Sequence, residues 1–561
     1  MTEIPSLLPL AAVLAPAVAV APILASGDRP NLREAWTLLA SVLALGAVAS
    51  MVPGVLAGDT YVTDLGTLVQ YVEFTLRVDA LGLLFGLLAS TLWLVTSLYS
   101  IGYMRGLDEH SQTRYFAAFA GSVASAVGVA FAANLVVLYL FYELLTVATY
   151  PLVAHDETDE ARAAGRKYLA YTFGGGVAVL AGILLVVHLA GSTGFVPGGV
   201  DALAGSDPTL ARAAFALLVT GFGVKAALMP LHSWLPDAMV APTPVSGLLH
   251  AVAVVKSGVF GVARVLLDVF GVELVADLGV GGVLAAVAAF TLVVASVIAL
   301  RQDNLKRRLA FSTVSQLSYI VLGLAVGAAA APSAATKWAL IGGLLHIPAH
   351  AFMKLTLFFC AGALHVETHT DDISEMAGIG RRMPLTMGAF AVAAAGMAGI
   401  PLVAGFVSKY FLLIGTVSAG DLAFTAALLV SGVLNIAYFW PVVYTAFFES
   451  HGDADEKPLL EGPLGGRFGT DARTDGGHAG ASGDDHHGDD HDHHGDDHDH
   501  HGGGPFERRA PNGAEGSWFL VAPILFAAAG SVALGVAPDA AVFLRVVREI
   551  VEQAAMLGVV A

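Results

Sequence analysis

Eight ionisable residues interrupt long apolar stretches of this 561-residue chain. They are one glutamate, four lysines and three histidines: Glu143, Lys225, His250, Lys256, His346, His350, Lys354 and Lys409. A charged side chain near the centre of a bilayer costs about 2.5–3.5 kcal/mol or more, so such residues are expected to have a function. Carboxylates, amines and imidazoles all gain and lose protons. The chemistry that this set predicts is therefore proton translocation.

Three of these residues follow one another at helical spacing. His346, His350 and Lys354 occupy positions i, i+4 and i+8, which places them on one helical stripe of about 12 Å. Such a stripe suits a proton relay. A lone histidine is more often a core imidazole bonded to a neighbouring carbonyl, and we interpret His188 and His365 in that way.

Two of the lysines stand beside prolines. Pro230 follows Lys225, and Pro401 precedes Lys409. Because proline lacks an N–H and clashes with the preceding turn, we expect a broken helix at each place. Paired interrupted helices are typical of inverted-repeat transporters, and their free carbonyls are tolerated where they line a buried, hydrated cavity.

The single acidic member of the set, Glu143, lies in the middle of the apolar run 138–146. A nearby carboxylate stabilises the charged form of a lysine. Movement of Glu143 relative to Lys225 would therefore switch the lysine between holding and releasing a proton. The alternative is that Glu143 only joins two helices.

The composition indicates which elements hold these residues. Hydrophobic residues make up 56% of the chain and charged residues 13%, against roughly 45–50% and 25% in soluble proteins. About 20 apolar residues span a bilayer as a helix. The chain offers about fourteen such runs, at 5–25, 35–53, 79–101, 113–133, 134–153, 165–189, 211–230, 242–267, 276–299, 309–328, 336–364, 384–416, 422–447 and 517–537.

Basic residues predict the orientation of these helices. Every cluster follows an odd-numbered helix: Arg29 and Arg33, Arg105 and Arg114, Arg162 to Lys167, Arg301 to Arg308, and Arg381 with Arg382. Basic loops stay in the cytoplasm. We therefore predict an all-α, polytopic protein of the plasma membrane, with broken helices 7 and 12 and both ends of the 14-helix core outside.

Four regions are predicted along the chain. Residues 1–78 hold helices 1 and 2 and an outer loop, and 79–448 form the core that carries the ionisable residues. Residues 449–510 read as a disordered cytoplasmic loop, since they are glycine-rich and cannot build a core. Residues 511–561 hold helix 14 and a helix lying at the membrane interface, because charges alternate with apolar residues there.

The 449–510 loop has an unusual composition. It holds 16 acidic and 5 basic residues, a net charge of −11 out of −18 for the chain. Clustered imidazoles and carboxylates can bind metals loosely, although the spacing matches no closed four-ligand site. The alternative is a solvated acidic linker. The candidate metal ligands are His486, His487, His491, His493, His494, His498, His500 and His501.

Several motifs of the core resemble a known family. They are residues 99–104, 141–145, 225–238, 241–250, 303–316 and 399–401. Together they are similar to the proton-conducting membrane subunits shared by complex I and the Mrp-type cation/proton antiporters, from about Asp79 to Phe448. Within that family, residues 142–155 most resemble the D-type subunits of the antiporters.

The resemblance implies a fold and roles for individual residues. It implies two inverted five-helix repeats, helices 4–8 and 9–13, joined by a central polar axis. Glu143 of helix 5 would pair with Lys225 of helix 7. The remaining members would be Lys256 on helix 8, His350 and Lys354 on helix 11, and Lys409 as the outlet on helix 12.

We therefore expect an ion-translocating subunit of a multisubunit sodium/proton antiporter, with other membrane subunits as partners and no catalytic chemistry of its own. The sequence contains no nucleotide, haem or flavin motif, and we predict no cofactor. One alternative is the proton-pumping subunit of a redox complex of the complex I or hydrogenase type. Others are a metal-ion transporter with a histidine-rich capture loop and a scaffold that conducts nothing.

Overall fold

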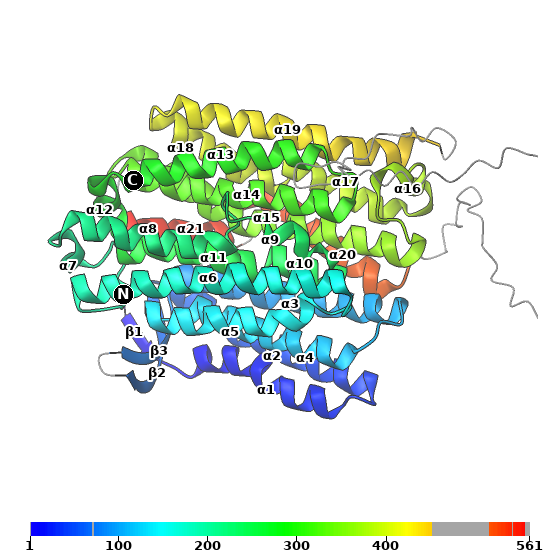
Figure 1. Cartoon of the computed structure of the whole chain (residues 1–561), viewed down its shortest axis with the longest axis horizontal. Coiled ribbons are helices and arrows are strands. Elements are labelled where there is room, and N and C mark those ends of the chain that lie inside the picture. Colours follow the sequence, from blue (N-terminus) through cyan, green and yellow to red (C-terminus); the bar gives the residue numbers. More distant parts are fainter. Residues whose placement is uncertain (1, 70–71, 451–514, 541, 556–561) are drawn as a thin grey trace, which may run out of the picture.

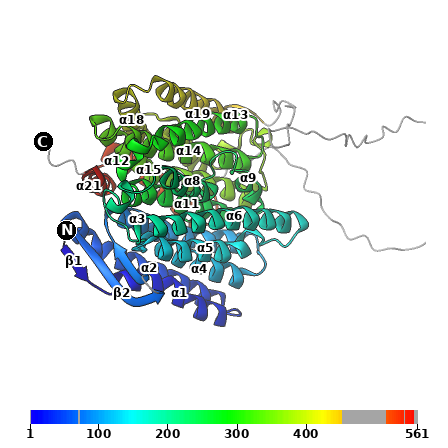
Figure 2. The same ribbon diagram turned by 60° about the vertical axis from the view of Figure 1, so that its left-hand side comes forward.

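A computed structural model describes residues 2–69, 72–450, 515–540 and 542–555. Long helices lie nearly parallel in it and form one bundle (Figure 1). The N-terminal helices form one edge, and the helix that ends at Phe448 forms the opposite edge. Figure 2 shows the same order after rotation.

Eleven helices of the described residues are long and apolar enough to span a membrane. They are α1 (Leu8–Ala25), α2 (Pro30–Leu56), α3 (Ala80–Gly106), α4 (Gln112–Phe131), α5 (Leu135–Val153), α6 (Asp159–Ala190), α13 (Val280–Leu300), α14 (Leu305–Ala329), α15 (Ala334–Thr368), α19 (Leu422–Phe448) and α20 (Trp518–Val536). A polytopic helical membrane protein is thus confirmed. The count of fourteen spans stays a prediction.

The other three predicted spans fall on interrupted helices. The first is α8 (Pro208–Lys225), followed by the short α9 (Trp234–Asp237) and η1 (Ala238–Val240). The second is divided into α10 (Thr243–Ala251) and α11 (Val254–Arg264), and the third into α17 (Pro384–Ala398) and α18 (Ala404–Ser418). The predicted breaks beside Lys225 and Pro401 are confirmed. The break between α10 and α11 was not predicted.

Short elements join these helices. They are α7 (Asp201–Ala204), the π-helical turn η2 (Val265–Val269), α12 (Gly271–Leu278), η3 (Ile373–Glu375) and α16 (Ile379–Arg382). We call α4 to α11 the first half of the core and α13 to α19 the second half.

A small sheet replaces much of the predicted outer loop. Strand β1 (Thr2–Pro5) pairs in parallel with β2 (Asp59–Val69), and β2 pairs in antiparallel with β3 (Val72–Val78). It lies beside one end of α1 and α2 (Figures 1 and 2). These strands were not predicted, because the segment was assigned only by its position between two spans.

The basic clusters gather at the other end of the bundle. Arg33 donates to Gln112, and Arg105 pairs with Glu34. These contacts join the start of α2 to the end of α3 and the start of α4. Their place at one end agrees with the observation that every basic cluster follows an odd-numbered predicted helix. The side of the membrane on which this end lies stays a prediction.

The central helices differ from those at the edges. The most apolar stretches of α14 and α15 are wholly buried, whereas α6 and α19 present large apolar side chains at the surface, among them Leu184, Val433 and Trp440. Exposed apolar faces of this kind suit lipid or other membrane subunits. The helix with the His346–Lys354 stripe is therefore the core of the bundle.

The last helix, α21 (Phe543–Ala555), is amphipathic. Its residues Val546, Val547 and Ile550 are buried, and Arg545 and Arg548 are exposed. Its neighbours include α3 and α15. The charge pattern therefore matches the one predicted, and its place at a membrane interface stays a prediction.

Candidate functional site

Lys225 is the last residue of α8 and is wholly buried. Its Nζ donates to the backbone carbonyl of Tyr142 on α5 at 2.6 Å and lies 3.4 Å from the centre of the Tyr142 ring. A carbonyl and a ring face both stabilise an ammonium group without neutralising it. The lysine is therefore bound to the residue that directly precedes Glu143 in the chain.

The carboxylate of Glu143 is packed rather than hydrogen-bonded. Neither of its oxygens has a hydrogen-bond partner among the described residues, and a Cβ at Gly176 would overlap Oε1. Glu143 and Lys225 are close enough for their charges to attract, yet the direct contact of Lys225 is with Tyr142. A small movement of α5 would thus change the environment of both groups.

The break after Lys225 is stabilised by side chains. Trp234 Nε1 donates to the carbonyl of Val224 at 2.8 Å, and Met229 N donates to Thr291 Oγ1 at 3.1 Å. Buried backbone groups need such partners once a helix ends. The Cβ of any larger residue at Gly258 would overlap the backbone of Ala226, so α11 crosses the break at close range.

Lys256 joins the two halves of the core. Its Nζ lies 2.8 Å from Nδ1 of His350 on α15, and both residues are wholly buried. In the part of the chain that is described, no hydrogen bond connects Lys256 directly to Lys225. His250 lies on the other side of the break at 252–253. The centre of its ring lies 4.8 Å from that of Phe358, with the two rings tilted, and neither ring nitrogen has a partner among the described residues.

The three residues of the α15 stripe are all buried, as their spacing predicts. The rings of His346 and His350 lie 6.1 Å apart. His346 Nδ1 lies 2.8 Å from Ser408 Oγ on α18, and Nε2 lies 3.0 Å from Gln316 Oε1 on α14. Because an amide oxygen only accepts, the proton of a neutral His346 is on Nε2.

Gln316 also hydrogen-bonds to polar side chains of α19, and we call this group the polar branch. Gln316 Nε2 donates to Asn435 Oδ1 at 3.3 Å, and the Tyr438 hydroxyl donates to the same oxygen. The sequence analysis missed Asn435 and Tyr438, both on α19. A buried asparagine in an apolar span was the available signal.

The remaining two lysines bind carbonyls. Lys354 Nζ donates to Leu309 O at 2.8 Å and to the hydroxyl of Ser312. Lys409 Nζ donates to Met397 O, a carbonyl released where α17 ends, and lies 4.7 Å from the Tyr319 ring centre. The broken helices that end at Lys225 and at Ala398 thus each have a buried lysine beside them.

These contacts bring together Lys256, His350, His346 and Ser408 in one row across the centre, and Ser408 precedes Lys409 in the chain. Lys225 and Glu143 form a separate group on the first half. Hydrogen-bonding contacts join Lys256 to His350 and His346 to Ser408, whereas among the described residues His350 and His346 are linked only by the contact of their rings.

A further buried charge cluster was not predicted. Arg264 of α11 binds both oxygens of Asp79, at 2.8 and 2.7 Å, and Asp268 at 2.7 Å. Asp79 also accepts from Gly82 N at 2.8 Å and so caps α3. The cluster joins the start of α3 to the end of α11.

Two interpretations of histidines were wrong. His188 is exposed on α6, and His365 is half-buried with Nδ1 3.1 Å from the Asp371 carboxylate. Neither is a core imidazole bonded to a carbonyl. The eight candidate metal ligands between His486 and His501 lie outside the described residues.

Comparison with known proteins gives one family match. The family described as NADH:quinone oxidoreductase/Mrp antiporter, TM matches residues 132–435. NADH-quinone oxidoreductase subunit N of Desulforudis audaxviator is 35% identical over 374 residues, which cover 66% of this chain and 72% of the relative. The A-type Na(+)/H(+) antiporter subunit of Alkalihalophilus pseudofirmus is 36% identical over 352 residues, covering 60% of this chain and 42% of that relative.

Solved structures give a likeness of fold. An archaeal membrane-bound sulfane sulfur reductase superposes with a TM-score of 0.76 at 21% identity, covering 98% of both chains. The Mrp complex from Dietzia sp. DQ12-45-1b gives 0.74 at 22% identity, covering 98% of this chain and 97% of that chain.

Proposed function

Because this chain belongs to the membrane-subunit family that NADH:quinone oxidoreductases share with Mrp antiporters, we propose that it is the ion-translocating subunit of a multisubunit sodium/proton antiporter. The observation that carries the proposal is the 2.8 Å contact between Lys256 and His350, which joins the two halves through buried titratable groups. The chain spans 42% of the antiporter relative. That relative is itself named as a subunit, so we expect other subunits to complete the transporter.

The protons would pass along the row of buried groups. Glu143 and Lys225 would load and release protons on the first half, and the pair Lys256–His350 would transfer them to the second half. His346, Ser408 and Lys409 would complete the exit, with His250 and Lys354 beside the row. Each transfer needs a donor and an acceptor in reach. The contacts of Lys256 with His350 and of His346 with Ser408 supply two such pairs, and a water molecule between the rings of His350 and His346, 6.1 Å apart, would supply the step between them.

The basic end of the bundle would face the cytoplasm of a cell whose plasma membrane contains the complex, since short basic loops are retained there. The partners would be other membrane subunits packed on the exposed apolar faces. Lipid would cover the rest.

A second candidate is the proton-pumping subunit of a redox complex. The 35% identity to a membrane protein of NADH-quinone oxidoreductase favours it. Genes for iron–sulfur proteins beside the gene for this chain would support that function.

The test is ion exchange in inverted membrane vesicles from cells that express the whole gene cluster. The proton gradient is followed by a fluorescent dye while sodium, potassium and lithium are added in turn. Sodium-dependent collapse of the gradient, without an electron donor, supports the antiporter. Proton uptake that needs an electron donor and is unaffected by cations supports the redox complex and contradicts the antiporter.

A further inference from the structure

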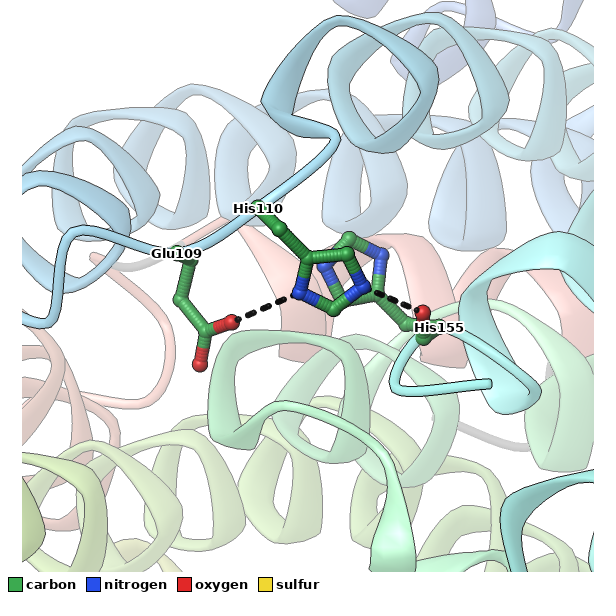
Figure 3. Close-up of side chains that lie close together, drawn as sticks. All are labelled: Glu109, His110 and His155. Carbon is green, nitrogen blue, oxygen red and sulfur yellow. Dashed lines mark hydrogen bonds and ion pairs between the residues drawn. The ribbon is translucent and has the colours of Figure 1, made fainter. Parts of the chain in front are cut away.

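Three side chains from two connections meet at the basic end of the bundle. Glu109 and His110 lie between α3 and α4, and His155 follows the end of α5 (Figure 3). One ligand atom from each of the three lies within 4.8 Å of the other two. None of them belongs to the buried row described above.

His110 is held in the tautomer that a metal ligand needs. Its Nε2 lies 3.0 Å from the backbone oxygen of His155, which only accepts, so Nε2 carries the proton. The lone pair is then on Nδ1, which lies 3.7 Å from Glu109 Oε2. A ligating histidine that donates its other N–H to a carbonyl is the usual arrangement in metal sites.

His155 supplies a second imidazole. Its side chain is wholly buried, and neither ring nitrogen has a hydrogen-bond partner among the described residues. The two histidine rings lie 4.7 Å apart, and in Figure 3 the His155 ring lies behind that of His110.

The alternative to a metal site is a simple contact between the two histidine rings, which would leave both ring nitrogens of His155 without a hydrogen-bond partner among the described residues. A buried imidazole with two unbonded nitrogens carries a desolvation cost that a ligand would offset. The neighbouring charges also favour a cation, because Asp156 adds its negative charge to that of Glu109. The nearby Arg114 is already paired with Glu157.

We propose that Glu109, His110 and His155 form a binding site for a divalent cation of the zinc class. Two imidazoles and one carboxylate are the donor set of three-ligand zinc sites, in which water takes the fourth position. Zinc bonds of 2.0–2.1 Å require ligand atoms about 3.3 Å apart. The side chains of Glu109 and His110 are 21% and 50% exposed, so they are free to rotate by the small amount needed.

The experiment must separate this site from the histidine-rich segment. We would use the full chain, purified without a histidine tag, with the eight histidines between His486 and His501 replaced by asparagine. Zinc binding to this parent protein is measured by equilibrium dialysis, and X-ray absorption at the zinc edge identifies the ligands. The variants are Glu109→Gln, His110→Asn and His155→Asn, with His188→Asn as the matched control.

The parent and the His188→Asn control are expected to bind one zinc ion with two imidazole ligands. Each cluster variant should lose at least about tenfold in affinity, since loss of a hydrogen-bond partner of a ligand already costs about that much. Glu109→Gln and His110→Asn change partly exposed side chains and report on binding even if His155→Asn does not fold. A parent that binds no zinc at micromolar concentration, or cluster variants that bind as the parent does, would overturn the proposal.

Discussion

Nζ of Lys256 and Nδ1 of His350 share one hydrogen bond of 2.8 Å between α11 and α15. Both groups are bases, so the bond holds one proton, which is on the lysine or on the imidazole nitrogen. Proton transfer within the bond therefore moves charge from the first half of the core to the second half. This makes the pair a control point of the proposed relay.

The first prediction concerns that pair. Lys256→Met and His350→Leu should each reduce cation/proton exchange by about a hundredfold, the typical contribution of a positioned proton-transfer group. The measurement is the initial rate of sodium-driven gradient collapse in vesicles, normalised to protein in the membrane. The double variant should be no slower than either single variant. Additive losses would show that the two residues act separately.

The second prediction concerns Lys225. Lys225→Ala should abolish pH-driven exchange while the protein still reaches the membrane, because Glu143 then has no lysine with which to exchange protons. Lys337→Ala is the matched control, since that lysine lies over Trp338 at the start of α15, away from the row. Exchange at the wild-type rate in Lys225→Ala would remove this residue from the mechanism.

Much of the fold could be predicted from residue types. Apolar runs indicated where the helices lie, and Pro230 and Pro401 predicted two of the three breaks, because proline removes a backbone donor. The third break, at Val252 and Ala253, has no proline or glycine beside it. Tertiary packing of α11 against the end of α8 decides it, and no local pattern carries that information.

The shared helix face of three candidate residues could be predicted, but the contacts between the candidate residues could not. The spacing of His346, His350 and Lys354 put them on one helix face, and the structure has them there. Nothing in the sequence indicated that Lys256 would bind His350, since that contact joins residues 94 positions apart. Likewise, Asn435 becomes meaningful only when α19 lies against Gln316.

The third prediction tests that polar branch. Gln316 Oε1 accepts a hydrogen bond from the N–H of His346 Nε2. The unprotonated Nδ1 therefore faces Ser408. Gln316→Leu removes the acceptor that keeps the proton on Nε2 of His346. Exchange should become about tenfold slower and its pH profile should shift, because a protonated Nδ1 could then face Ser408. Gln316→Glu, which keeps an accepting oxygen, should restore part of the rate. A slow Gln316→Leu with an unchanged pH profile would indicate only a structural role.

The fourth prediction concerns stability. Arg264 is 1% exposed and depends on Asp79 and Asp268 for its charge balance. Asp79→Asn removes the bidentate partner, and breaking a buried ion pair costs about 3–5 kcal/mol. The midpoint of thermal unfolding in detergent should fall clearly. Asp207→Asn is the control, because that carboxylate is exposed and caps the start of α8, away from the cluster. Equal unfolding midpoints for the two variants would contradict a stabilising role of the Asp79–Arg264 ion pair.

The fifth prediction concerns pH. Burial lowers the pKa of His155 to about 4 from its usual value of 6.5, so the unfolded chain binds a proton that the folded chain does not bind. Stability therefore falls as the pH drops from about 6.5 towards 4. His155→Asn has no such proton and should show a shallower fall. Burial raises the pKa of Glu109 and gives the opposite slope, but both proteins retain that residue.

The measurement is the midpoint of thermal unfolding at pH 6.5, 5.5 and 4.5, with a chelator present so that no metal occupies the two connections. His188→Asn is the control and should follow the wild type, because His188 is exposed on α6 and lies in neither connection. If His155→Asn loses stability with acid as steeply as the wild type does, His155 is not held in its neutral form.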